Sequence, residues 1–289
     1  MTEPVGRERP RHPISARVLR REQLSPSLVR LVVGDGDIAR FDGERAAAFA
    51  DAYVKVMFLH PEADYDRPID MAAIRTSHPA EHWPKLRTYT VREWDADAQE
   101  LTLDFVVHGE EGLAGPWAAS VGTGAEILLN GPGGGYSPDP EADWHLLVGD
   151  DSALPAIAAA LQRLRNRAGD PAETLVFIEV HDQAHEIPLA IGARTTVHWV
   201  HRGDEAVGLR LVEQVGRALF PAGRVHAFVH GEAGAVRQLR RHLRGERGIG
   251  LDQLSISGYW RLGADDEAWR AAKRDSNTAV EAEDPVPGG

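Results

Sequence analysis

Hydrophobic and polar residues alternate along several short stretches in the first half of the chain. The clearest stretch runs over residues 100–108, where apolar side chains stand at positions 101, 103, 105 and 107. A period of two places these side chains on one face of a β-strand. Similar stretches, separated by turn residues, cover residues 16–20, 28–33, 51–59, 87–92 and 126–129. Six short strands with turns between them predict a closed antiparallel barrel.

The period changes in the second half of the chain. After an apolar stretch at 144–149, the residues Leu154, Ile157, Leu161 and Leu164 recur at helical spacing. Further strands are predicted at 174–181, 195–201, 225–230 and 253–260, and helices at about 206–219 and 233–243. This alternation predicts a parallel sheet with helices on both faces.

Proline-rich segments divide the chain. Pro138-Asp139-Pro140 separates the two patterns, so we expect a barrel domain over residues 14–139 and an α/β domain over residues 143–263. Residues 264–289 are predicted to form a short acidic helix and a disordered tail. Residues 60–86 contain four prolines and are predicted to form one long polar loop.

Composition narrows the chemistry. The chain has no cysteine, which excludes disulfides, thiolate nucleophiles and iron–sulfur clusters. Redox chemistry would therefore need an organic cofactor, or a metal held by histidine and carboxylates. The net charge of −12 argues against nucleic acid as the main partner. There is no long apolar run, and residues 1–13 are polar, so we expect no membrane insertion, no secretory signal and a cytoplasmic location.

The hexapeptide Arg87-Thr88-Tyr89-Thr90-Val91-Arg92 carries the strongest chemical signal. A guanidinium binds phosphate, an aromatic ring packs against a planar ring, and a hydroxyl can meet a ring nitrogen. In a regular strand Arg87 and Tyr89 share one face, and Thr88, Thr90 and Arg92 share the other. Flavin adenine dinucleotide (FAD) fits such a surface. An ordinary barrel strand with polar residues facing water explains the hexapeptide equally well.

Two further segments are candidate cofactor contacts. His108-Gly109 begins a glycine-rich stretch that leads into a predicted short helix, where backbone N–H groups could bind an anion. Gly149-Asp150-Asp151-Ser152-Ala153 joins the first strand and helix of the second domain, the place where open α/β sheets bind nucleotides. Adjacent carboxylates would repel phosphate there, so this turn either covers a flavin or nicotinamide ring or simply caps the helix.

Five sequence blocks, taken in order, resemble one known family. They are Asp51–Lys55, Arg87–Arg92, Asp104–Gly109, Gly149–Ile157 and Gly258–Arg261. Together they are similar to the siderophore-interacting proteins, flavin-dependent ferric-siderophore reductases with ferredoxin-reductase-like architecture. The resemblance spans about residues 14–270. It implies a six-stranded antiparallel FAD-binding barrel followed by a parallel-sheet domain that resembles NAD(P)-binding domains.

The resemblance also implies roles for individual residues. Arg87 would contact the flavin pyrophosphate, Tyr89 would pack against the isoalloxazine, and Thr90 would hydrogen-bond near its N5. Tyr259 and Trp260 would cover the flavin, unless they are only buried edge-strand aromatics. The full set of expected cofactor contacts is Arg87, Tyr89, Thr90, Val91, His108, Gly109, Gly112, Ala114, Gly115, Trp117, Asp151, Ser152, Ala153, Tyr259 and Trp260.

The implied reaction is reduction of a ferric siderophore to release Fe(II), with NAD(P)H or ferredoxin as electron donor. Many ferric siderophores are anionic, so a basic docking site is expected. Lys55 and Arg261 are the main candidates, with Arg92 as a weaker third. Lys55 could instead extend to water at the barrel rim, and Arg261 could pair with an acid in residues 264–267. A general flavin or ferredoxin-type reductase and a non-catalytic siderophore-binding protein are the alternatives.

The histidines of residues 60–86 raise the question of a metal site. His78 and His82 are four residues apart, with Glu81 between them, and His60 begins the same segment. Two histidines at that spacing can bind a metal on a helix. Pro79 disfavours helix at His78, however, so the sequence predicts no metal site.

Overall fold

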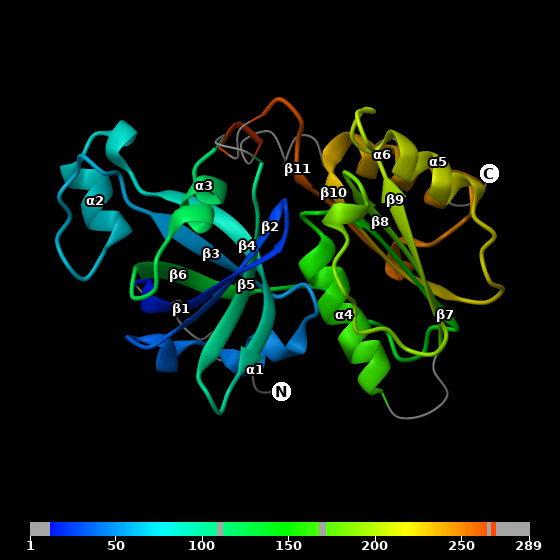
Figure 1. The fold of residues 1–289 in the computed structure, drawn as a ribbon, viewed down its shortest axis with the longest axis horizontal. Coiled ribbons are helices and arrows are strands. Elements are labelled where there is room, and N and C mark those ends of the chain that lie inside the picture. The colour runs from blue at the N-terminus through cyan, green and yellow to red at the C-terminus, as the bar shows by residue number, and fades with distance from the viewer. Residues whose placement is uncertain (1–11, 109–111, 168–171, 265–266, 270–289) are drawn as a thin grey trace, which may run out of the picture.

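Six antiparallel strands in the first half of the chain close into a barrel in the computed structural model (Figure 1), which describes residues 12–108, 112–167, 172–264 and 267–269. The strands are β1 (Ile14–Ser25), β2 (Leu28–Gly34), β3 (Tyr53–Phe58), β4 (Lys85–Asp95), β5 (Glu100–Val106) and β6 (Glu126–Gly133). Their order is β1-β2-β5-β4-β3-β6, and β6 pairs back to β1. The predicted six-stranded barrel is confirmed.

Alternate apolar side chains of these strands fill the barrel. Val54, Leu103 and Phe105 have no exposed surface and belong to one continuous core. Burial of this kind contributes about 1.5 to 3 kcal/mol for each large side chain, which is why the period of two specifies the inward face. Short helices lie around the barrel: η1 (Ile38–Arg40), α1 (Gly43–Ala48) and α3 (Ala114–Ser120).

The prediction of one long polar loop over residues 60–86 was wrong. This segment contains α2 (Met71–Ser77) and η2 (Ala80–His82), and β4 already begins at Lys85. Tyr65, Ile69 and Ile74 are buried in a small second core on the outside of the barrel, together with Met57 and Leu128. The prolines suggested a loop, but the apolar residues between them have a surface to pack on.

The second half of the chain forms a five-stranded sheet. Its strands are β7 (Trp144–Asp150), β8 (Glu173–Val180), β9 (Thr195–His201), β10 (Val225–Glu232) and β11 (Leu254–Trp260). They pair in parallel in the order β11-β10-β7-β8-β9. Helix α4 (Leu154–Asn166) packs on one face, while α5 (Leu209–Arg217) and α6 (Ala233–Arg241) pack on the other (Figure 1). The predicted parallel sheet is confirmed, with shorter helices than expected.

Helix α4 joins the two halves of the molecule. Leu154 and Ile157 of α4 share one buried cluster with Leu28 and Tyr136 from the barrel side. The short elements η3 (Gln183–His185), His242–Glu246 and η5 (Leu251–Gln253) complete the second half. Of the predicted C-terminal helix, residues 267–269 are helical and Trp269 is buried, while the predicted tail lies outside the described residues. No helix among the described residues is long and apolar enough to cross a membrane.

Candidate active site

Arg87 lies near the start of β4 and holds a carboxylate. Its two terminal nitrogens donate to the two oxygens of Glu267, at 2.5 Å and 3.0 Å. The guanidinium lowers the pKa of Glu267 by hydrogen bonding. A phosphate group presents two oxygens to an arginine in the same way as this carboxylate does. Arg87 is therefore positioned as an oxyanion receptor, and its contact with a pyrophosphate stays a prediction.

The rest of the hexapeptide is anchored in the barrel. The Tyr89 ring lies 4.0 Å from the Phe105 ring, centroid to centroid. Thr90 and Val91 are both buried, and the pairing of β4 with β5 is irregular between Val91 and Glu93. The expected regular alternation therefore ends at Val91. Thr90 pairs with Tyr53 on β3, so the segment is held from both sides.

The irregularity redirects Arg92 toward α4. Its Nη1 atom donates to Oε1 of Gln162 at 2.9 Å, and burial lowers the pKa of Arg92. A cavity of about 580 Å³ lies beside this contact, lined by residues such as Trp94 and Arg163. Two predicted site residues line this cavity, Val91 and the weaker docking candidate Arg92. The structure thus places Arg92 at the contact between barrel and α4.

The glycine-rich segment after β5 leads into α3 as predicted. The helix begins at Ala114, and the residue before it, Leu113, makes no side-chain cap. A Cβ atom at Gly115 would lie 3.1 Å from the Val106 carbonyl oxygen, so glycine permits close approach of α3 to β5. His108 and Gly112 are exposed on either side of the predicted contact Gly109, which lies outside the described residues.

Trp117, from the same helix, packs against barrel aromatics. Its ring meets Phe58 edge-on at 5.4 Å and lies 5.8 Å from Phe105. Because Phe105 also contacts Tyr89, this aromatic group connects α3 to β4. Aromatic pairs of this geometry contribute about 0.5 to 1.5 kcal/mol each beyond their buried area. Trp117 thus positions the two segments that were predicted to hold one cofactor.

The turn after β7 is organised by Asp150. Its Oδ1 accepts hydrogen bonds from the backbone N–H and hydroxyl of Ser152, at 2.9 Å and 2.5 Å. Its Oδ2 accepts from the Glu232 N–H and from the Trp260 indole Nε1, both at 2.8 Å. Ala153 is fully buried in the core behind this turn. The Asp150 carboxylate therefore stabilises the turn, but no side chain caps α4, so the simple helix cap is not what the structure shows. The predicted cofactor contacts of Ser152 and Ala153 stay predictions.

Asp151 lies at the contact between the two halves. It is buried, and its Oδ1 accepts a 3.3 Å hydrogen bond from the Ser27 hydroxyl in the turn between β1 and β2. Burial, with the neighbouring charge of Asp150, raises the pKa of Asp151 to about 7. Nothing local to Ser25-Pro26-Ser27 points to the second half of the chain, so the sequence does not predict Ser27 as a partner of Asp151.

The end of β11 brings Tyr259 toward the barrel. Its ring lies 4.7 Å from that of His230. Burial raises the pKa of Tyr259, and so do the nearby groups Asp51, Asp150 and Tyr53. Tyr53 belongs to β3, two residues before Lys55, so Tyr259 lies where β3, β7 and β11 meet. Trp260 is oriented by its hydrogen bond to Asp150. An edge-strand packing role and a flavin-covering role both remain compatible with these contacts.

Two acids at the ends of the neighbouring strands were not among the predicted site residues. Glu179, at the end of β8, is 2% exposed and accepts from the Gly208 N–H at 2.8 Å. Glu232, at the end of β10, caps α6 by accepting from the Ala235 N–H at 2.9 Å. Both stand beside Asp150 at the carboxyl edge of the sheet. An acid at the end of an otherwise apolar strand was the available sequence signal.

The two proposed docking cations lie on different domains. Lys55 is half-buried in the middle of β3, between Thr88 on β4 and Asn130 on β6. Arg261 is exposed directly after β11. Within the part of the chain that the structure describes, neither side chain forms an ion pair, and Glu267 pairs with Arg87 instead of Arg261. Both positive charges can therefore meet an anionic ligand.

Comparison with known proteins identifies the family. Residues 17–136 match the siderophore-interacting FAD-binding domain, and residues 142–263 match the siderophore-interacting protein domain. Ferric vibriobactin reductase ViuB of Vibrio cholerae is 32% identical over 256 residues, which cover 87% of this chain and 90% of ViuB.

Similar solved structures support the same family and fold. The siderophore-interacting protein SipS from Aeromonas hydrophila has a TM-score of 0.76 at 27% identity, covering 93% of this chain and 99% of SipS. Ferredoxin-NADP⁺ reductase from Plasmodium falciparum shares the fold alone, with a TM-score of 0.62 at 11% identity, covering 86% of this chain and 96% of that one. The chain belongs to the siderophore-interacting protein family and has a ferredoxin-reductase-like fold.

Proposed function

We propose that this protein binds FAD against β4 and α3 and uses it to reduce ferric siderophores, so that iron is released as Fe(II). The observation that carries the proposal is the Arg87 guanidinium, which donates hydrogen bonds to both oxygens of a carboxylate. Arg87 belongs to the barrel, which matches an FAD-binding domain. In this proposal, phosphate oxygens of FAD would take the place beside Arg87 that the Glu267 carboxylate occupies in the structure. Tyr89 and Thr90 follow on the same strand and would hold the isoalloxazine.

The residues around this strand suit the chemistry of a ferric chelate. Bound FAD would accept electrons in pairs and deliver them singly, which ferric iron requires. The chain's own contribution is to bind and orient. Lys55 and Arg261 would attract the anionic chelate, while Tyr259 and Trp260 would exclude water from the ring face. Siderophores hold Fe(II) far more weakly than Fe(III), so one electron suffices for release.

The electron donor is proposed to be NAD(P)H or reduced ferredoxin. The carboxyl edge of the parallel sheet is the usual dinucleotide site in this architecture. Here four acids line that edge: Asp150 and Glu232, together with Asp151 and Glu179, whose pKa values burial raises. The carboxylates that are ionised there oppose a pyrophosphate. A donor that docks without placing phosphates on the turn after β7 is favoured. We expect the reaction to take place in the cytoplasm.

The test starts from purified protein titrated with FAD. The loaded protein is then reduced anaerobically with NADH, NADPH or reduced ferredoxin in parallel, and mixed with ferric chelates of different charge. Appearance of Fe(II), trapped by a colour-forming chelator, with flavin still bound, is the expected result. Release of reduced flavin during turnover would indicate a general flavin reductase. Binding of the ferric siderophore without electron transfer would indicate a binding protein, and failure to bind FAD would overturn the proposal.

A further inference from the structure

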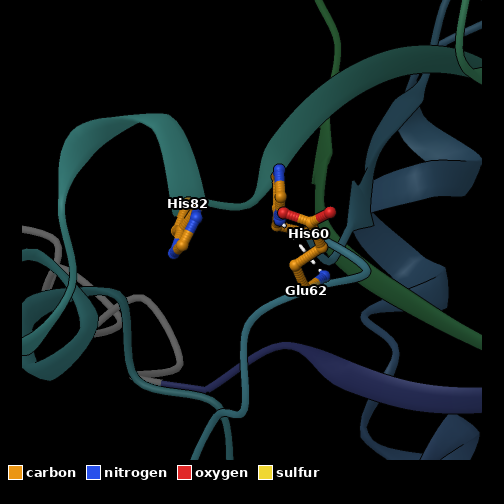
Figure 2. A group of neighbouring side chains, drawn as sticks. All are labelled: His60, Glu62 and His82. Carbon is orange, nitrogen blue, oxygen red and sulfur yellow. Dashed lines mark hydrogen bonds between the residues drawn. The ribbon is translucent and has the colours of Figure 1, made fainter.

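Two histidines and a glutamate converge outside the barrel, beside the end of β3 (Figure 2). His60 follows β3 and Glu62 lies two residues further on, while His82 ends η2. One side-chain donor atom from each residue lies within 4.8 Å of the other two. We propose that His60, Glu62 and His82 form a binding site for a divalent first-row transition-metal ion.

Backbone contacts hold the two histidines in place without any metal. The Tyr65 hydroxyl accepts a hydrogen bond from the His60 N–H at 3.1 Å and donates one to the His82 carbonyl oxygen. Tyr65 itself is buried in the small core that also contains Ile69 and Ile74. One packed side chain therefore ties together two segments that are 22 residues apart in sequence. The site is preorganised at the level of the backbone.

The side chains of the cluster are not committed elsewhere. The imidazoles of His60 and His82 stack, with ring centroids 4.6 Å apart and planes inclined by 29°. His60 Nδ1 accepts a long 3.3 Å hydrogen bond from the Glu62 N–H (Figure 2). Among the described residues, the His82 ring and the Glu62 carboxylate have no hydrogen-bond or ion-pair partner. Ring stacking alone explains why the two imidazoles lie together, but it does not explain why the Glu62 carboxylate lies beside them.

The dimensions fit a metal after a small adjustment. Metal–nitrogen bonds of about 2.0 to 2.1 Å place neighbouring ligand atoms of a tetrahedral site about 3.4 Å apart. The present separations of up to 4.8 Å must shrink by up to about 1.4 Å. Rotation of the exposed Glu62 side chain and of the two rings provides this movement. Because Glu62 is exposed and both histidines are only half-buried, water can reach the ion and fill its remaining coordination positions.

The donor set selects the kind of ion. Two imidazole nitrogens and one carboxylate oxygen suit zinc, nickel, cobalt or ferrous iron, whereas magnesium prefers oxygen ligands alone. The site is separate from the predicted flavin contacts, so the inference does not depend on the proposed function. It also lies on the segment that carries α2, so a bound ion would fix residues 60–62 to η2.

The structure also removes the sequence argument against a metal. From the sequence, His78 and His82 could bind a metal only as a pair on one helix, and Pro79 disfavours such a helix. His78 in fact lies at the end of α2, where its Nε2 is within 2.8 Å of the Asp64 carbonyl oxygen and its Nδ1 within 2.8 Å of the Ser77 hydroxyl. His82 faces His60 instead. Pro79 therefore has no bearing on the set that actually converges.

The test is calorimetric titration of the untagged full chain with zinc chloride, and separately with magnesium chloride. We expect one zinc ion per chain and no comparable magnesium binding. His60→Ala and His82→Ala should each weaken zinc binding at least tenfold, because each removes a ligand. Glu62→Gln, an exposed and nearly isosteric change that leaves the fold intact, should weaken it as well. His201→Ala is the control, a histidine on β9 that is paired with Glu186 in the second half of the chain, and should bind zinc like the wild type.

Equal zinc affinity in the wild type and in Glu62→Gln and His82→Ala would overturn the proposal. Absence of stoichiometric zinc binding, or magnesium binding of equal strength, would overturn it too. FAD uptake is measured on the same samples. If the wild type does not bind FAD, the proposed function is contradicted and the metal result is unaffected. The proposed function and the metal site are therefore tested independently.

Discussion

Replacing Glu267 tests whether Arg87 is the phosphate receptor. In the structure the two terminal nitrogens of the Arg87 guanidinium both donate to Glu267. If FAD uses the same nitrogens, Glu267 and the pyrophosphate compete. Glu267→Gln should therefore strengthen FAD binding, whereas Arg87→Ala should weaken it. The two changes act on one ion pair and yet have opposite expected effects, which no general loss of stability would produce.

The expected changes in FAD affinity follow from the solvent exposure of the Glu267 and Arg87 side chains. The Glu267 side chain is 46% exposed, so solvent screens its ion pair with Arg87, and the pair stabilises the protein by less than about 1 kcal/mol. Its removal should lower the FAD dissociation constant by up to about fivefold. Arg87 is only 16% exposed, and loss of its charge-assisted hydrogen bonds to a pyrophosphate should cost about 2 to 3 kcal/mol. That corresponds to roughly 30- to 150-fold weaker binding.

The assay is equilibrium titration of the FAD-free protein with FAD, followed by the change in flavin fluorescence. Arg217→Ala, which breaks an exposed ion pair with Glu213 on α5, is the control and should leave FAD affinity unchanged. Weaker FAD binding in Glu267→Gln would refute the competition argument. Unchanged binding in Arg87→Ala would show that the pyrophosphate lies elsewhere.

Three further changes probe other parts of the site. Lys55→Ala should raise the KM for an anionic ferric siderophore in steady-state assays and leave flavin content unchanged; loss of flavin would show that Lys55 serves the cofactor instead. Trp260→Phe removes the 2.8 Å hydrogen bond to Asp150 and should lower the free energy of unfolding by about 1.5 to 3 kcal/mol in urea denaturation, with an unchanged midpoint contradicting the assignment. Asp151 has a folded-state pKa raised from 3.8 to about 7, so the folded state retains its proton where the unfolded state has lost it, and the contribution of Asp151 to the free energy of unfolding should fall as pH rises from about 4 to 7. His145, whose pKa burial lowers to about 4, contributes the opposite slope, so the measurement is the difference in unfolding free energy between the wild type and Asp151→Asn: it should decrease over this pH range, and a difference independent of pH would exclude the role of Asp151.

Much of the fold could be predicted because its signals are local. A period of two identifies a half-buried strand from about six residues, and helical spacing with a following strand identifies βα units. The prediction of a loop over residues 60–86 was wrong because the structure of this segment depends on contacts that are not local. Tyr65, Ile69 and Ile74 are spaced by neither period alone, and their burial depends on the outer surface presented by Met57 and Leu128. Composition could not show that the outside of the barrel offers an apolar surface there.

The site was predictable only in part. Arg87, Tyr89 and Thr90 lie together on β4, as their adjacency in sequence predicted, and their contacts with a flavin stay predictions. Glu179 and Glu232 were missed, since their relation to Asp150 arises from the order of strands in the sheet. That order places β10 and β8 on either side of β7, although other elements separate them along the chain.

The sequence by itself determined the types of the main elements, the barrel-then-sheet succession and the short motif expected to hold a flavin. These depend on side chains a few residues apart, whose spacing sets which face of a strand or helix they share. Only the tertiary structure decided which polar groups meet. Arg87 with Glu267, Asp150 with Trp260 and His60 with His82 are contacts made when distant segments pack. Their partners are chosen by strand order and loop packing, and no local pattern encodes either.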